Sequence, residues 1–163
     1  MTRENKQGPI TLQPVRDEDV PMIKQWLYKE YILEWYHEPD EWIREIEERE
    51  GEFGFLNHYI VYDGNTPFAF CQYYDCFDAQ EEWYTVSYPA RTYSIDYLIG
   101  ESSYLGRGYG KAIVKALINK IKSHEGAMEI VVKPEKENIP SCKTLLSCGF
   151  TFNDDKQYYT INL

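Results

Sequence analysis

The chain has 163 residues, of which 27 are acidic and 17 basic, so its formal net charge is −10. This charge argues against a nucleic-acid backbone as partner and would favour a small cationic molecule, but acidic proteins are common, so charge alone leaves the partner undecided. Hydrophobic residues make up 43% and aromatic residues 16%, which is enough for a packed core, and we expect a single domain spanning residues 1–163. The sequence contains no apolar run near the roughly 20 residues that cross a bilayer, so we expect no membrane association.

Targeting and metal-binding patterns are also missing from the sequence. Residues 1–9 lack the apolar core of a secretory signal, so we expect a cytoplasmic protein. The cysteines, which have no Cys-x-x-Cys spacing, and the three histidines do not complete a zinc pattern. We therefore expect free thiols and no metal site, and the oligomeric state stays open.

The first part of the chain is predicted to form one strand and two helices. Residues 10–15 alternate between apolar and polar side chains, as in a short strand. Asp17 is a candidate N-cap for a helix through residues 20–27. A second helix, rich in glutamate, is predicted to start near Asp40 and to continue through Ile46.

The middle of the chain is predicted to form strands. Apolar segments at 58–62 and 67–74 flank the turn at 63–65, which indicates a hairpin, and residues 92–99 form a further strand.

The last third alternates between helices and strands. An apolar stripe predicts a helix through 109–121, which is followed by a strand at 128–132, a short helix from Pro140 and a closing hairpin over 149–163. This order indicates an α+β (mixed α/β) domain built on one central sheet.

A glycine-rich segment, Leu105-Gly106-Arg107-Gly108-Tyr109-Gly110-Lys111, joins a strand to the clearest helix. A helix N-terminus presents unpaired N–H groups to an anion, and glycines let the backbone approach phosphates closely. The segment is neither a Walker loop nor a Rossmann fingerprint, because the required spacings fail. Taken alone, it could also be a plain strand-to-helix connection.

Segments 95–111 and 138–150 together resemble the acetyl-CoA-binding core of the GNAT acetyltransferase superfamily. The family pattern Gln/Arg-x-x-Gly-x-Gly/Ala falls on Leu105, Gly108 and Gly110, with leucine at the first position. A later pattern, Asn-x-x-Ala followed by Tyr and Gly-Phe, falls on Asn138, Ser141, Leu145, Gly149 and Phe150.

This resemblance implies the GNAT fold, in which helices flank a mostly antiparallel central sheet with a splayed strand pair, and it implies acetyl-CoA as co-substrate. The arm of acetyl-CoA would lie in the splay, where a backbone N–H near Leu98 or Ile99 would stabilise the oxyanion. The full set of residues that would bind it is Leu98, Ile99, Gly106, Arg107, Gly108, Tyr109, Gly110, Lys111 and Asn138.

A longer resemblance, to the aminoglycoside 6'-N-acetyltransferases, rests on Trp26-Leu27, on 33–36 and on 96–101, where Tyr97 replaces the family's glutamine. It implies that Asp96 orients or deprotonates an amine. The alternative is a strand aspartate paired with a neighbouring Arg or Tyr.

Acidic and aromatic residues suit a cationic amine through ion pairs and cation–π contacts, although they could equally form solvated acidic surfaces over an aromatic core. The expected substrate contacts are Trp26, Glu34, Trp35, Tyr36, Tyr74 and Asp75.

Two positions depart from the resembling enzymes. Leu145 stands where a tyrosine would protonate the leaving thiolate, and Lys133 stands where several of these enzymes have an aspartate. A protein N-terminal or lysine acetyltransferase, or a catalytically weak acyl-CoA-binding protein, therefore remains an alternative to an enzyme for small cationic amines.

Overall fold

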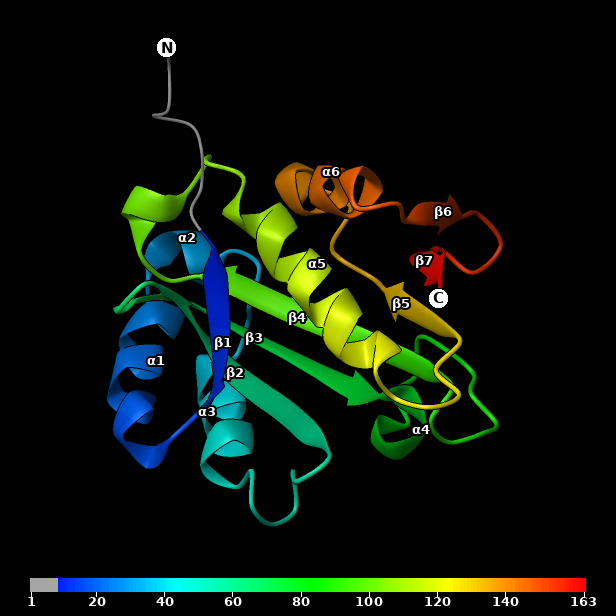
Figure 1. Cartoon of the computed structure of the whole chain (residues 1–163), viewed down its shortest axis with the longest axis horizontal. Helices are drawn as coiled ribbons and strands as arrows, with labels where there is room; N and C mark the ends of the chain where they lie inside the picture. Colours follow the sequence, from blue (N-terminus) through cyan, green and yellow to red (C-terminus); the bar gives the residue numbers. More distant parts are fainter. Residues whose placement is uncertain (1–8) are drawn as a thin grey trace.

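The computed structural model describes residues 9–163, so the segment on which the absence of a secretory signal was judged lies almost wholly outside the described residues. One seven-stranded sheet has the strand order β1-β2-β3-β4-β5-β7-β6 (Figure 1). All neighbouring strands are antiparallel except β4 and β5, which are parallel. The mixed α/β class and the mostly antiparallel sheet are thus confirmed.

The elements follow the predicted order, with two short helices added. The strands are β1 (Ile10–Pro14), β2 (Leu56–Asp63), β3 (Thr66–Asp75), β4 (Thr92–Ile99), β5 (Glu129–Val132), β6 (Thr151–Asn153) and β7 (Tyr158–Asn162). The helices are α1 (Val20–Leu27), α2 (Glu30–Leu33), α3 (Pro39–Glu47), α4 (Cys76–Ala79), α5 (Tyr109–Lys122) and α6 (Ile139–Ser147). The four-residue helices α2 and α4 were not predicted, because such short segments show no helical periodicity.

The predicted N-cap at Asp17 is wrong. A 3-10 turn over Asp17–Asp19 precedes α1, and the carboxylate of Asp17 accepts instead from Arg49 Nη2 at 2.6 Å. The buried Asp19 accepts from the backbone N–H of Arg16 at 2.8 Å, so this side chain fixes the entry into α1.

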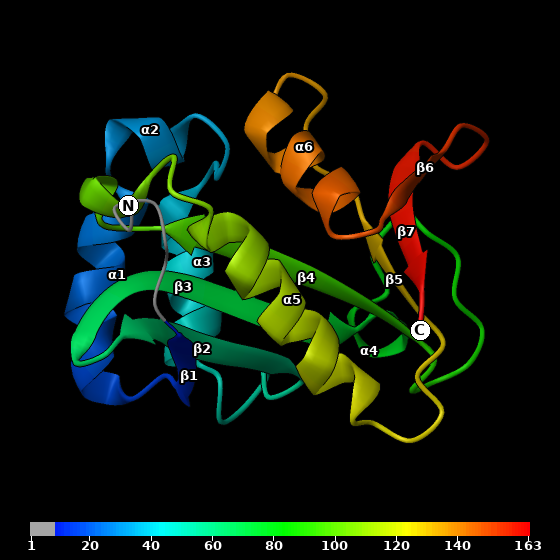
Figure 2. The same cartoon turned by 45° about the horizontal axis from the view of Figure 1, so that its top comes forward.

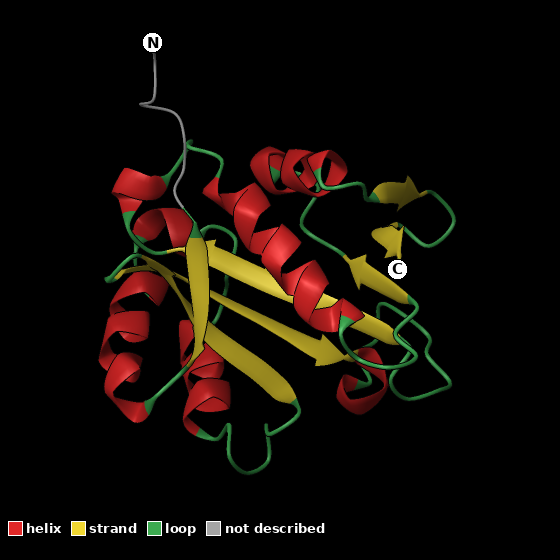
Figure 3. Ribbon diagram, in the orientation of Figure 1, coloured by secondary structure: helices red, strands yellow, loops and turns green. Residues whose placement is uncertain are grey.

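Helices cover both faces of the sheet (Figures 2 and 3). Apolar residues of α1 and α3 form one core with Ile60, Phe70 and Leu98 of the sheet. On the opposite face, α5 packs along the sheet and buries residues such as Ile113 and Leu117. Within residues 9–163, no helix is long and apolar enough to cross a membrane.

The sheet splits beside β4. This strand pairs with β3 from Asp75↔Tyr93 to Ala69↔Ile99, but with β5 only at Thr92↔Glu129 and Tyr93↔Ile130. From Ser94 to Ile99 one edge of β4 therefore has no strand partner among residues 9–163, which confirms the expected splayed pair. The open edge faces the N-terminal end of α5 and helix α6 (Figure 1).

Candidate active site

A cavity of about 650 Å³ lies at the open edge of β4. Its walls come from α3, the sheet, the segment after α4, the segment after β5 and α6. Its lining has more carboxylates than lysines. The positive side chain of Lys133 is outnumbered by the negative ones, which are Glu38, Glu41, Glu45, Glu81, Asp96 and Glu135. A cavity with this lining attracts a cation.

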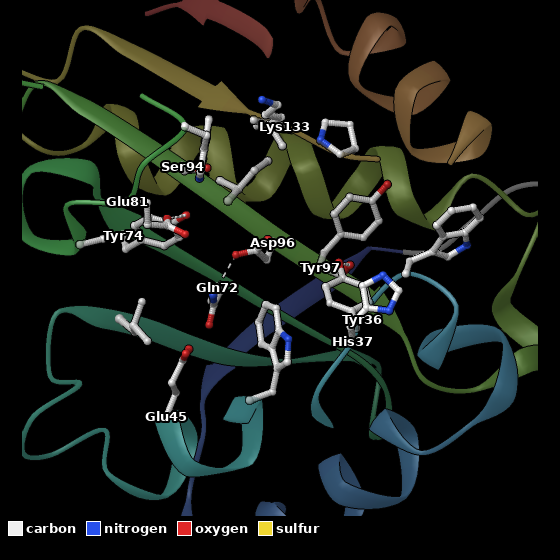
Figure 4. A pocket seen from close by; sticks show the side chains of 18 of the residues that line it. Tyr36, His37, Glu45, Gln72, Tyr74, Glu81, Ser94, Asp96, Tyr97 and Lys133 are labelled. Carbon is white, nitrogen blue, oxygen red and sulfur yellow. Dashed lines mark hydrogen bonds between the residues drawn. The ribbon is translucent and has the colours of Figure 1, made fainter. Parts of the chain in front are cut away.

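Asp96 lies in the middle of this cavity, where Gln72 Nε2 donates to its carboxylate at 2.9 Å (Figure 4). The two residues are register partners on β4 and β3, so the sheet fixes their contact. Burial raises the pKa of Asp96 to about 7, and the charges of Glu81 and Glu45 add to this rise while the Gln72 hydrogen bond opposes it. A carboxylate with a pKa near neutrality can accept a proton from an amine and release it again.

Glu45 on α3 and Glu81 on the segment after α4 approach Asp96 from different sides (Figure 4). Burial, followed by the charge of Glu81, raises the pKa of Glu45 to about 6. The hydroxyl of Tyr74 donates to Glu81 Oε1 at 2.5 Å and so orients that carboxylate. A cation placed among these groups would relieve their mutual repulsion.

Part of the expected substrate-contact set lines the cavity, namely Trp35, Tyr36 and Tyr74. Trp26 does not, because its indole is 1% exposed and its Nε1 donates to Glu101 Oε2 at 2.6 Å. Asp75 instead accepts from the N–H groups of Phe77 (3.0 Å) and Ala90 (2.6 Å) and holds the loop after β3. Glu34 is exposed outside this lining. These placements argue against direct contact of Trp26, Asp75 and Glu34 with a substrate in this cavity.

The backbone of β4 offers hydrogen-bonding groups to the open edge at alternate residues. The N–H of Gly100 donates to Phe68 O in β3 at 2.8 Å, so by strand alternation the main chain of Leu98 also faces β3. The groups of Tyr97 and Ile99 face the opening, where the hydroxyl of Tyr31 donates to Ile99 O at 2.7 Å. Of the two expected oxyanion donors, the geometry therefore favours the N–H of Ile99 over that of Leu98, and it adds the N–H of Tyr97.

The glycine-rich turn adopts a backbone conformation that requires glycine and leads into the N-terminus of α5. Gly106 and Gly108 have φ of 70° and 82°, in the left-handed region that favours glycine, and Gly108 is the N-cap of α5. Arg107 and Lys111 are exposed beside it, whereas the ring of Tyr109 is buried and leaves only its main chain for binding. The N-terminal N–H groups of α5 and these two cations fit the pyrophosphate of acetyl-CoA.

Asn138 lines the cavity, and its Oδ1 accepts from the N–H of Ser141 at 3.3 Å and caps α6. Its side chain thus fixes the start of α6.

The sequence placed Glu81 in an acidic and aromatic segment suited to a cationic amine, but it did not single out Gln72 and Glu45 as site residues. Gln72 could have been found by drawing the register of β3 against β4, since it falls opposite Asp96. Glu45 and Glu81 lay inside recognised acidic segments, but nothing local indicated which carboxylates point inward.

The splayed sheet, the glycine turn at a helix N-terminus and the acidic cavity together define the chain as an acetyltransferase with acetyl-CoA as donor. A family model described as acetyltransferase (GNAT) domain matches residues 15–157, and the chain belongs to this family.

Similar proteins are aminoglycoside 6'-N-acetyltransferases. "Aminoglycoside N(6')-acetyltransferase type 1" of Klebsiella pneumoniae is 22% identical over 152 residues, which cover 90% of this chain and 76% of that protein. The structure of AAC(6')-Ib in complex with paromomycin and acetyl-CoA has a TM-score of 0.82 at 20% identity, with 95% of this chain and 94% of that chain covered. An aminoglycoside N(6')-acetyltransferase structure from Legionella pneumophila has a TM-score of 0.73 at 19% identity, with 96% and 92% covered.

Proposed function

We propose that this N-acetyltransferase acetylates a primary amine of a small polycationic molecule, and that an aminoglycoside 6'-amine is a candidate acceptor. The observation that carries the proposal is the position of Asp96, which lies in an acidic, aromatic-walled cavity at the open edge of β4. The known relatives that act on aminoglycosides support the same class of acceptor.

Each group of the site has a role in the transfer. Acetyl-CoA supplies an acetyl group activated as a thioester. The glycine turn and the start of α5 hold its phosphates, and the N–H groups of Tyr97 and Ile99 donate to the carbonyl oxygen as negative charge develops there. Asp96 orients the amine nitrogen and takes its proton while the C–N bond forms and the C–S bond breaks. Glu45 and Glu81 bind further ammonium groups of the acceptor.

The test is a thiol-release assay with saturating acetyl-CoA over a panel of amines: kanamycin, ribostamycin, a linear polyamine and lysine-containing peptides. We expect turnover with polycationic small molecules, and we expect Asp96→Asn to lower the rate roughly 10²-fold or more while the affinity for CoA is kept. Asp78→Asn is the matched control, because Asp78 is exposed outside the cavity lining.

Two results would overturn the proposal. Release with peptides alone would assign the enzyme to protein acetylation. No release with any amine, while calorimetry shows CoA bound, would indicate an acyl-CoA-binding protein. An analogue in which a hydroxyl replaces the 6'-amine tests the position of attack, since it should not be acetylated there.

A further inference from the structure

The leaving sulfur needs a proton donor, and the residue at position 145 cannot supply one. Breaking the C–S bond leaves the electron pair on sulfur, and protonation of that sulfur lowers the barrier when a positioned acid provides it. Leu145 lines the cavity with an apolar side chain and is 1% exposed. The candidate donors are therefore the other hydroxyl groups of the cavity wall.

Two of the cavity's tyrosines already donate their protons elsewhere. The hydroxyl of Tyr36 donates to the carbonyl of Tyr97, and the hydroxyl of Tyr74 donates to Glu81. The hydroxyl of Tyr97 lies instead beside the side-chain hydroxyls of Ser141 and Thr144 on α6. The hydroxyl of Thr144 donates to Pro140 O at 2.9 Å and so can only accept from Tyr97, whereas the hydroxyl of Ser141 can donate to the phenol oxygen. The proton of Tyr97 is therefore shared with a neutral hydroxyl at most, and not with a carboxylate or carbonyl, and it can turn to a third partner.

Tyr97 stands between the glycine turn and the acceptor cavity. A β-carbon added at Gly110 would lie 3.4 Å from Cε2 and from the hydroxyl oxygen of Tyr97, so the phenol rests against the first turn of α5. The same side chain lines the cavity that contains Asp96. In Figure 4 the tyrosine ring extends away from Asp96, on the side of the cavity where α5 and α6 lie.

The strand explains why an acid and a base can act from opposite sides here. Neighbouring residues of a strand direct their side chains to opposite faces, so Asp96 and Tyr97 diverge from adjacent positions. Both still reach one cavity because the edge of β4 that faces away from β3 has no strand partner within residues 9–163 beyond the pair Tyr93↔Ile130. A thioester held along this edge would have the carboxylate on its amine side and the phenol on its sulfur side.

We propose that Tyr97 is the catalytic acid of the transfer and donates its hydroxyl proton to the leaving sulfur of CoA. The inference rests on the proposed acetyl transfer. The amine nitrogen forms the C–N bond and loses one proton to Asp96, while the C–S bond breaks and sulfur takes the proton of Tyr97. Asp96 has then gained a proton and Tyr97 has lost one, and solvent restores both groups.

The environment of Tyr97 keeps it protonated until it is needed. Burial raises its pKa above the ordinary value for tyrosine, while hydrogen bonds with Thr144 and Ser141 oppose the rise. A phenol in this state is neutral throughout the physiological pH range and can act as an acid.

The first test uses CoA alone and needs no acceptor. The ultraviolet absorbance of the thiolate is titrated against pH for CoA bound to the wild type and to Tyr97→Phe, with desulfo-CoA as blank. A hydrogen bond from Tyr97 stabilises the thiolate, so the ionisation constant of the bound thiol should fall roughly tenfold in the variant. Phenylalanine keeps the ring that packs against Gly110.

The second test is the pH dependence of turnover with whichever amine proves active. Tyr97→Phe should lower kcat about 10²-fold, keep the KM for acetyl-CoA, and lose the falling limb at high pH that an ionising acid causes. Tyr62→Phe is the matched control, since it removes a phenol hydroxyl from β2, outside the cavity lining. Tyr97→Gln repeats both measurements with a side chain that lacks an acidic proton.

The outcomes separate this inference from the proposed function. Equal thiol ionisation in the wild type and in both Tyr97 variants, with CoA bound to all, overturns the role of Tyr97 and leaves acetyl transfer intact. A wild type that binds no CoA overturns the proposed function itself. A full rate with Tyr97→Phe and an unchanged pH profile also excludes Tyr97 as the acid.

Discussion

A row of neutral polar side chains crosses the sheet and ends at Asp96. His58, Gln72 and Asp96 are successive register partners across β2, β3 and β4. Burial lowers the pKa of His58 to about 4, so its ring is neutral and brings no charge toward the carboxylate. Among the described residues, both ring nitrogens of His58 and the Oε1 of Gln72 lack hydrogen-bond partners, and these atoms belong to neighbouring side chains. The hydrogen bond from the Gln72 amide lowers the pKa of Asp96 and so partly offsets the rise that burial causes.

The pH dependence of the reaction should report this arrangement. In the proposed transfer Asp96 must be ionised to accept a proton, and its pKa is about 7, so kcat/KM for the amine should rise with pH around neutrality. Gln72→Met keeps a similar volume but removes the donor to the carboxylate, so the rising limb should move upward by about one pH unit. Steady-state kinetics from acid to mildly alkaline pH measure the rising limb of the wild type and that of the variant. A limb that stays in place in Gln72→Met would contradict the assignment of this limb to Asp96.

At the level of elements, the end of β4 depends on close packing against α1. A β-carbon at Gly100 would lie 2.0–2.3 Å from ring carbons of Trp26, whose indole is held by Glu101. Neither the ring nor the strand can move far enough in a packed core to relieve this clash. Gly100→Ala should therefore cost about 3 kcal/mol or more of unfolding free energy.

Chemical denaturation of Gly100→Ala and of Gly51→Ala measures this cost. Gly51→Ala is the control, because a β-carbon there makes only an ordinary contact of 3.8 Å with Glu48 O. Similar midpoints for the two variants would show that α1 shifts away from the strand at little cost.

The features that could be predicted from the sequence are those whose signal lies within a short continuous segment of the chain. The hairpin of β2 and β3, helix α5 and the glycine turn each carry their signal within one continuous segment, and so does the motif around Asp96. The direction in which a side chain or backbone group points is set by tertiary packing. For this reason the contacts expected of Trp26, Asp75 and Leu98 do not fit their positions in the structure. The contact between Gln72 and Asp96 joins residues 24 apart in the chain and needed the strand register.

At the level of the whole molecule, the charge distribution provides separate regions for a cationic acceptor and an anionic donor. The net charge is −10, and the acceptor cavity carries several of the carboxylates, whereas Arg107, Lys111 and Lys115 surround the start of α5. A polycationic acceptor is therefore attracted by the molecule as a whole, and an anionic donor by the local positive charge at one helix end.

Because the proposed acceptor is attracted by negative charge, its binding should be sensitive to the salt concentration. The Debye length falls from roughly 30 Å at 0.01 M to about 10 Å at 0.1 M, so the KM of a polycationic amine should rise about three- to tenfold over this range while kcat stays constant. The double variant Glu45→Gln with Glu81→Gln should weaken binding at low salt and flatten the dependence, because both carboxylates line the cavity. The double variant Glu50→Gln with Glu125→Gln removes the same two negative charges from exposed sites outside the lining and should leave most of the slope. An equal loss of slope from this control would mean that net charge, and not the cavity, selects the acceptor.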